Sequence, residues 1–200
     1  RALKNRFWTT DNVGLFRMLW DGLQDLSNPG MEFIDENTNH LPGSALTLTI
    51  EWNRPILIEI EALTTYTKFG YPKRSARGIG WGKLDLLIAV MSRFTDTKLE
   101  NFDAYINVAR WLSISEPWVD LACIAAMMSS KRNISLGRTI FLWEVSLTWV
   151  VKNTFLMEKR LKEAHKLWFT HAYIPEWYDG SIPPGMECKK IRKVSELLAS

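Results

Sequence analysis

The spacing of apolar residues near the start of the chain is that of an amphipathic helix. Between Thr10 and Leu26 the apolar positions recur every three or four residues: Val13, Phe16, Leu19, Trp20, Leu23 and Leu26. Thr10 and Asp11 can cap such a helix, and Asn28-Pro29-Gly30 would end it. The pattern therefore predicts a helix over residues 10–26.

The period then changes to two, which is the period of a half-buried β-strand. Leucine and isoleucine alternate with polar residues in LTLTIEW (46–52), and the same alternation returns in ILIEIE (56–61). Matching of apolar partners predicts that Ile50 lies opposite Ile58 and Leu48 opposite Ile60, across a three-residue loop. We therefore expect a β-hairpin over about residues 45–63.

The middle of the chain is predicted to be helical. Residues 84–94 are apolar on nearly all sides, which indicates a buried central helix. Thr97-Lys98-Leu99-Glu100 has the form of a capping box and predicts a helix through Leu112, and Ser115-Glu116-Pro117 predicts another to about Ser130.

The last third of the chain combines a strand region with a helix. Alternation predicts a long strand within residues 133–151, and helical spacing predicts an amphipathic helix over 154–172. Proline and glycine then punctuate residues 174–185, ahead of the run CKKIRKVSELLAS, which is predicted to be a short basic helix.

Strands and helices that are segregated along a chain favour the α+β class. We expect a mainly helical body with a hairpin at about 45–63, a second strand region at about 133–151, and a single core. Residues 1–173 would form one domain, and 174–200 a linker with the C-terminal helix.

Composition places the chain among ordinary globular proteins, with 46% apolar and 24% charged residues and a net charge of +3. Only two cysteines are present, in unlike contexts, which favours an intracellular, reducing setting. No apolar run reaches the roughly 18 residues of a transmembrane helix. Ten tryptophans indicate a protein that packs against others, so a homo-oligomer is one expectation.

The sharpest feature is the stretch Lys68–Lys83, KFGYPKRSARGIGWGK, which has five positive charges, no negative ones and four glycines. We interpret it as a basic flexible loop whose cations contact an anionic partner while its rings stack on unpaired bases or anchor a protein contact. The predicted binding residues are Lys68, Tyr71, Lys73, Arg74, Arg77, Trp81 and Lys83. Nucleic acid and an acidic protein surface both remain open as partners, and so does an idle surface loop. The glycines match neither a P-loop nor a dinucleotide motif.

A second cationic group lies near the C-terminus: Lys189, Lys190, Arg192 and Lys193. On a short helix with one apolar side, these residues could bind an acidic membrane surface peripherally, bind a partner, or dock on their own domain.

Carboxylates provide the only arrangement that resembles an enzyme site. Glu51, Glu59 and Glu61 share the polar face of the predicted hairpin, where they could hold a divalent cation for a metal-dependent nuclease. The segment departs from the Glu-x-Lys of such nucleases because Glu59-Ile60-Glu61 has no lysine. The alternative is three solvated glutamates, with no metal and no cofactor.

The leading interpretation is a non-catalytic interaction or assembly module of a viral or nucleoprotein-associated kind. The order of hairpin, basic glycine-containing loop, apolar helix and the later segment NISLGRTIFLWEVSLTW resembles the layout of rhabdovirus matrix proteins. The resemblance carries no specific motif, and implies a structural protein that binds nucleoprotein. The metal-dependent nuclease is the alternative from another functional class.

Overall fold

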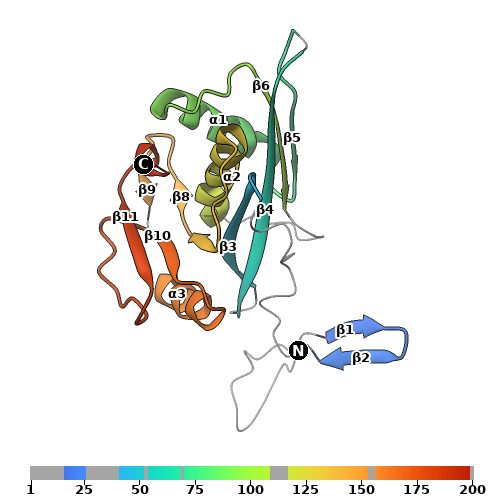
Figure 1. Cartoon of the computed structure of the whole chain (residues 1–200), viewed down its shortest axis with the longest axis vertical. Coiled ribbons are helices and arrows are strands. Elements are labelled where there is room, and N and C mark those ends of the chain that lie inside the picture. Colours follow the sequence, from blue (N-terminus) through green and yellow to red (C-terminus); the bar gives the residue numbers. More distant parts are fainter. Residues whose placement is uncertain are drawn as a thin grey trace.

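A seven-stranded mixed sheet is the centre of the molecule (Figure 1). The computed structural model describes residues 16–25, 41–51, 54–68, 70–108, 117–152 and 156–198. The strand order is β11-β10-β7-β3-β4-β6-β5. The pairs β3–β4 and β4–β6 are antiparallel, and the other neighbours are parallel.

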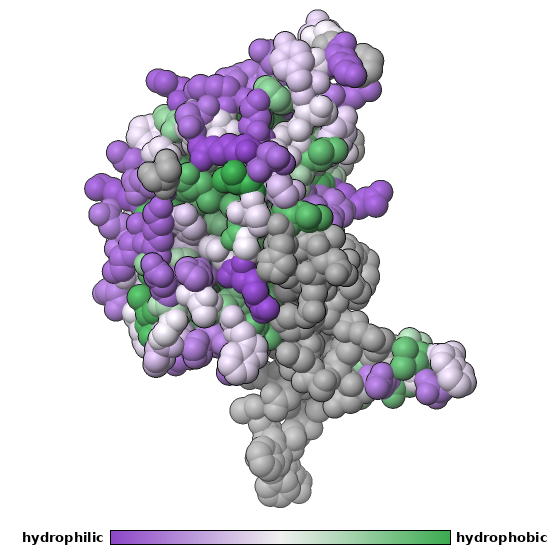
Figure 2. Space-filling model, in the orientation of Figure 1, coloured by the Kyte–Doolittle hydropathy of each residue, from purple (hydrophilic) through white to green (hydrophobic). Residues whose placement is uncertain are grey.

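The predicted N-terminal helix is wrong within the described residues. Strands β1 (Phe16–Leu19) and β2 (Gly22–Asp25) form an antiparallel hairpin there. Gly22 has φ 131°, a conformation that suits the turn and that no helix contains. Phe16, Met18 and Leu23 are exposed on this hairpin, part of which is green in Figure 2. Residues 10–15 and 26 lie outside the described residues.

The predicted β-hairpin is present as β3 (Ser44–Glu51) and β4 (Arg54–Tyr66), with a different register. Glu51 lies opposite Arg54 across a two-residue connection, and Leu48 lies opposite Leu57 instead of Ile60. Both strands are buried on both faces over 45–49 and 55–60. Apolar residues therefore line either face, so matching them on one face could not determine the register.

The most buried helix is α2 (Asp120–Arg132), whose first ten residues are all buried. The predicted core helix is present as α1 (Trp81–Phe94), but Leu86 on it is exposed. The helix predicted from residue 97 to residue 112 is wrong, because β6 (Phe102–Val108) runs through the middle of that range. Phe102 and Ile106 are four residues apart, a spacing that also fits one face of a strand.

The last third of the chain returns to the same sheet. After β7 (Thr139–Phe141) come β8 (Glu144–Val145) and β9 (Val151–Lys152), which pair with each other, so the single long strand is wrong. Helix α3 (Met157–Lys166) is shorter than predicted. Strands β10 (His171–Pro175) and β11 (Glu187–Ile191) follow. The expected C-terminal helix is therefore replaced by β11 and a short 3₁₀ turn, η2 (Val194–Glu196).

The expectation of a mainly helical body is wrong. More of the described residues lie in strands than in helices, and the helical elements are α1, α2, α3 and the short 3₁₀ turns η1 (Pro117–Val119) and η2. Helices were over-predicted at 16–25 and 102–108 because apolar residues three or four positions apart do not by themselves distinguish a helix from strands. Among the described residues, no helix is long and apolar enough to span a membrane.

Candidate nucleic-acid interface

The β4–β5 connection is a short, anchored loop at one end of the sheet (Figure 1). The Thr67 amide donates to Asn101 O, the Lys73 amide donates to Asp103 Oδ1, and Lys73 O accepts from Ala104. Between these anchors Lys68 and Tyr71 are exposed, and Tyr71 is 88% accessible. The backbone is held while the side chains face solvent.

An aromatic and cationic group lies beside this loop. Tyr66, at the end of β4, is 65% exposed and packs edge-on against Phe102 of β6 with centroids 5.5 Å apart. Lys131 of α2 places Nζ 3.3 Å from the centroid of the Phe102 ring. Three elements distant in sequence thus bring a ring and a cation to the loop. We call Tyr66, Lys68, Tyr71, Lys73 and Lys131 the loop surface.

Sequence reasoning missed Tyr66, Phe102 and Lys131. Tyr66 and Phe102 fall at the end of one strand and the start of its antiparallel neighbour, where Tyr66 pairs with Phe102. Correct assignment of β6 would have placed these two rings side by side. No local signal in the sequence placed Lys131 near them.

The predicted loop contains a strand, β5 (Arg74–Arg77), at the edge of the sheet. Alternation along β5 sends its two arginines to opposite faces. Arg74 pairs with Asp85 of α1 at 2.8 Å, and an exposed pair of this kind contributes about 0–1 kcal/mol. Arg77 is exposed on the other face. The arginines therefore do not form one patch.

Lys83 is a structural residue in this fold. Its Nζ lies 2.6 Å from Oδ1 of Asp120, which joins the start of α1 to the start of α2. Desolvation raises the pKa of Asp120 to about 6, and the ammonium of Lys83 opposes that rise. An external anion would have to compete with this buried carboxylate, so Lys83 is a poor candidate for partner binding. The Trp81 side chain lies outside the described residues.

The C-terminal cations lie at the far edge of the sheet, on and after β11. Lys190 Nζ donates to Tyr178 O, Lys189 lies 5.5 Å from the Tyr173 ring, and Lys193 lies 5.9 Å from the Trp149 ring. Arg192 is 4.0 Å from Glu176. Since β5 and β11 are the two edges, this group and the loop surface are separate.

The carboxylates of the nuclease alternative do not form an open site. Glu59 is buried and accepts a hydrogen bond from Ser44 Oγ at 2.5 Å, while Glu61 accepts from Asn107 Nδ2 at 2.7 Å. The Glu51 side chain lies outside the described residues. No cluster of three histidine, cysteine or acidic residues suited to a metal ion occurs in the part of the chain that the structure describes.

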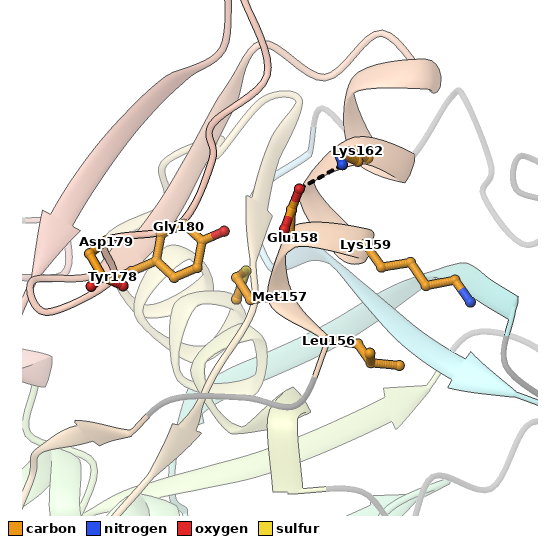
Figure 3. Close-up of a pocket in the computed structure, with 8 residues that line it drawn as sticks. All are labelled: Leu156, Met157, Glu158, Lys159, Lys162, Tyr178, Asp179 and Gly180. Carbon is orange, nitrogen blue, oxygen red and sulfur yellow. Dashed lines mark ion pairs between the residues drawn. The ribbon is translucent and has the colours of Figure 1, made fainter.

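A hollow of about 590 Å³ lies between the start of α3 and the segment 178–180 (Figure 3). Lys162 Nζ and Glu158 Oε1 lie 2.6 Å apart across one helical turn, and Lys159 extends sideways from the helix, away from Tyr178 and Asp179. Asp179 adds a carboxylate on the opposite wall. Two lysines and two carboxylates balance in charge, so this hollow has no excess of positive charge that would attract an anion.

Comparison with known proteins gives consistent matches. No protein-family model matches the chain. It is 39% identical over 201 residues to "DNA repair protein RadA" of Bacillus subtilis, 36% to the protein of that name from Streptococcus pyogenes serotype M1, and 36% to that from Listeria monocytogenes. Each match covers 99% of this chain and 44% of the relative, so the chain spans less than half the length of these relatives.

These relatives overturn the interpretation as a viral or nucleoprotein-associated assembly module. Similarity over nearly the whole chain outweighs a resemblance that consists only of the order of elements and carries no specific motif. The chain is similar, from end to end, to part of bacterial proteins named for DNA repair.

Proposed function

We propose that this chain is a DNA-binding part of a DNA repair protein and that it binds DNA through the loop surface. The observation that carries the proposal is the gathering of two exposed tyrosine rings and three lysines at one end of the sheet. The names of the relatives supply the class of partner, which charge alone left open.

The chemistry of the loop surface fits a flexible polyanion. Lysine ammonium groups neutralise phosphates, and release of the condensed counterions makes such binding salt-dependent. Exposed tyrosine rings offer flat faces on which bases can stack, and each stacked base contributes about 1–3 kcal/mol to the binding free energy. The anchored backbone of the loop keeps the entropy cost of binding low, because the ends of the loop are already fixed.

The test is the binding of a fluorescein-labelled 15-nucleotide DNA strand, followed by anisotropy between 50 and 200 mM salt. We expect log K to fall linearly with log salt, with a slope of about −0.7 for each phosphate contact. Lys68→Glu combined with Lys131→Glu should lower the affinity at least tenfold and flatten the slope. Tyr71→Ala should lower the affinity without changing the slope.

The matched control is Lys162→Glu combined with Lys166→Glu on α3, which changes the net charge equally and away from the loop surface. It should alter the affinity by no more than about twofold, since exposed charges beyond a Debye length of about 8–10 Å are screened. Equal losses in both double variants would refute the proposed location. Absence of binding at 50 mM salt would refute DNA binding by this chain.

A further inference from the structure

On the face of the sheet opposite α2, Leu63 and Thr65 of β4 and Ser75 and Arg77 of β5 are exposed. The Thr64 hydroxyl contacts Ser130 Oγ of α2 at 3.2 Å, so the Thr64 side chain lies on the α2 side. Successive side chains alternate, so the neighbouring positions of β4 point to the other face. Register then brings together two rows on that face. We call them the outer platform: Glu61, Asn107 and Arg77 in one row, and Leu63, Tyr105 and Ser75 in the next.

These six side chains line a depression of about 380 Å³. Leu63 is 60% exposed, Tyr105 is half-buried, and Arg77 is exposed. Within the described residues, no carboxylate forms an ion pair with Arg77, although Glu61 lies in the same row. The platform therefore has an aromatic ring, a positive charge without an ionic partner, and a carboxylate.

The Glu61 carboxylate is held in place by a hydrogen bond and can still accept further hydrogen bonds. Asn107 Nδ2 donates to Glu61 Oε2 at 2.7 Å. A carboxylate has two oxygens and about four acceptor sites, so one bond from Asn107 leaves room for two further donors. Asn107 is thus a positioning residue for Glu61.

We infer that the outer platform binds an unpaired guanine base of the DNA that the loop surface holds, an inference that rests on the proposed function. Tyr105 would stack on the base, as aromatic residues do on the faces of unstacked bases. Glu61 would accept from the two adjacent N–H donors on the Watson–Crick edge, which guanine alone among the DNA bases presents side by side. Arg77 would contact O6 or the adjoining phosphate.

The position of the platform agrees with this occupant. Thr65 and Asp103 form the next row of the same face, and Asp103 accepts from the amide of Lys73 in the loop surface. Rows two residues apart are separated by about 6.6 Å along a strand, a distance that one nucleotide of an extended strand can span. Thr65 in that row is exposed and Asp103 is buried, so DNA bound at Lys68, Tyr71 and Lys73 would reach the platform past Thr65.

The experiment is titration of the ¹⁵N-labelled protein with dGMP and, separately, with dTMP. We expect dGMP to shift the amide signals of Ser75, Arg77 and Asn107 and to bind at least fivefold tighter than dTMP. Glu61→Gln, which replaces one acceptor with a donor, should remove this preference, whereas Tyr105→Leu should weaken the binding of both nucleotides through lost stacking. The control Glu187→Gln, on β11 at the opposite edge, should keep it.

Equal shifts with both nucleotides, shifts confined to other elements, or a preference that survives Glu61→Gln would overturn the inference. Binding of dGMP to the outer platform does not involve the loop surface. Lys68→Glu with Lys131→Glu should therefore leave the affinity for dGMP unchanged. DNA binding without a guanine preference would therefore refute the platform alone. A platform that binds dGMP in a chain that binds no oligonucleotide would refute the proposed function alone.

Discussion

Replacing Trp168 with glycine should stabilise the protein. Trp168 follows α3 with φ 64°, and its amide donates to His165 O while the next amide, of Phe169, donates to Ala164 O. These two bonds define a Schellman motif, in which the left-handed position is usually glycine. The Trp168 side chain is 82% exposed, so its removal costs little burial.

The expected gain is about 1 kcal/mol. A left-handed conformation costs a residue with a Cβ about 1–2 kcal/mol, which glycine would relieve. The greater freedom of glycine in the unfolded chain offsets about 0.5–1 kcal/mol of this stabilisation. For a chain of this length, 1 kcal/mol raises Tm by about 2–4 °C. Urea denaturation at constant m-value would measure the change directly.

Two variants separate relief of backbone strain from loss of an exposed ring. Trp168→Ala removes the same ring but keeps a Cβ, so it should gain little. Trp177→Gly makes the same substitution at a residue without positive φ, and should lower stability by about 1 kcal/mol. If Trp168→Ala stabilises as much as Trp168→Gly, or if Trp168→Gly destabilises, the argument from φ is refuted.

Three other outcomes can be measured on the same protein. Gly43→Ala should lower the free energy of unfolding by at least 2 kcal/mol in urea, because φ is 94° and the new Cβ would lie 2.4 Å from Ala62 O; an unchanged midpoint would contradict this. Asp120 has a pKa of about 6 in the folded protein against an ordinary 3.8, so the folded state binds more protons between these values. Stability should therefore fall by up to about 3 kcal/mol as pH rises from 4 to 6, and Asp120→Asn should remove that fall in thermal melts across this range. Lys131→Gln should weaken DNA binding and lower the salt slope by about 0.7 in the anisotropy assay, whereas Lys159→Gln on α3 should not.

Part of the fold could be predicted because the pattern is local. Alternation in residues 46–61 identified the β3–β4 hairpin, an apolar run identified α1, the start signal Ser115-Glu116-Pro117 identified α2, and helical spacing identified α3. Register and the identity of β6 could not be predicted in this way. The register depends on what covers each face of β3 and β4, and both faces are buried there; in β6 the apolar residues Phe102 and Ile106 fit helical spacing as well as one face of a strand.

The residues of the candidate site also differ in whether the sequence alone could identify their role. Tyr71 and Lys68 could be chosen from the sequence because a short run of charge and glycine between regular elements is a local signal. Lys83 was chosen by the same signal, yet it pairs with Asp120, and nothing near Lys83 in the sequence shows that partner.

The sequence by itself determined that the chain has a core, that β3 and β4 form a hairpin, and that residues 68–83 concentrate positive charge. Only the tertiary structure decided which of those charges face solvent, because pairing depends on residues brought together by folding. The same process placed Lys131 beside Tyr66 and Phe102, and aligned Glu61, Asn107 and Arg77 across three strands. Short-range periodicity encodes elements, whereas a surface made from several elements exists only once their register and packing are fixed.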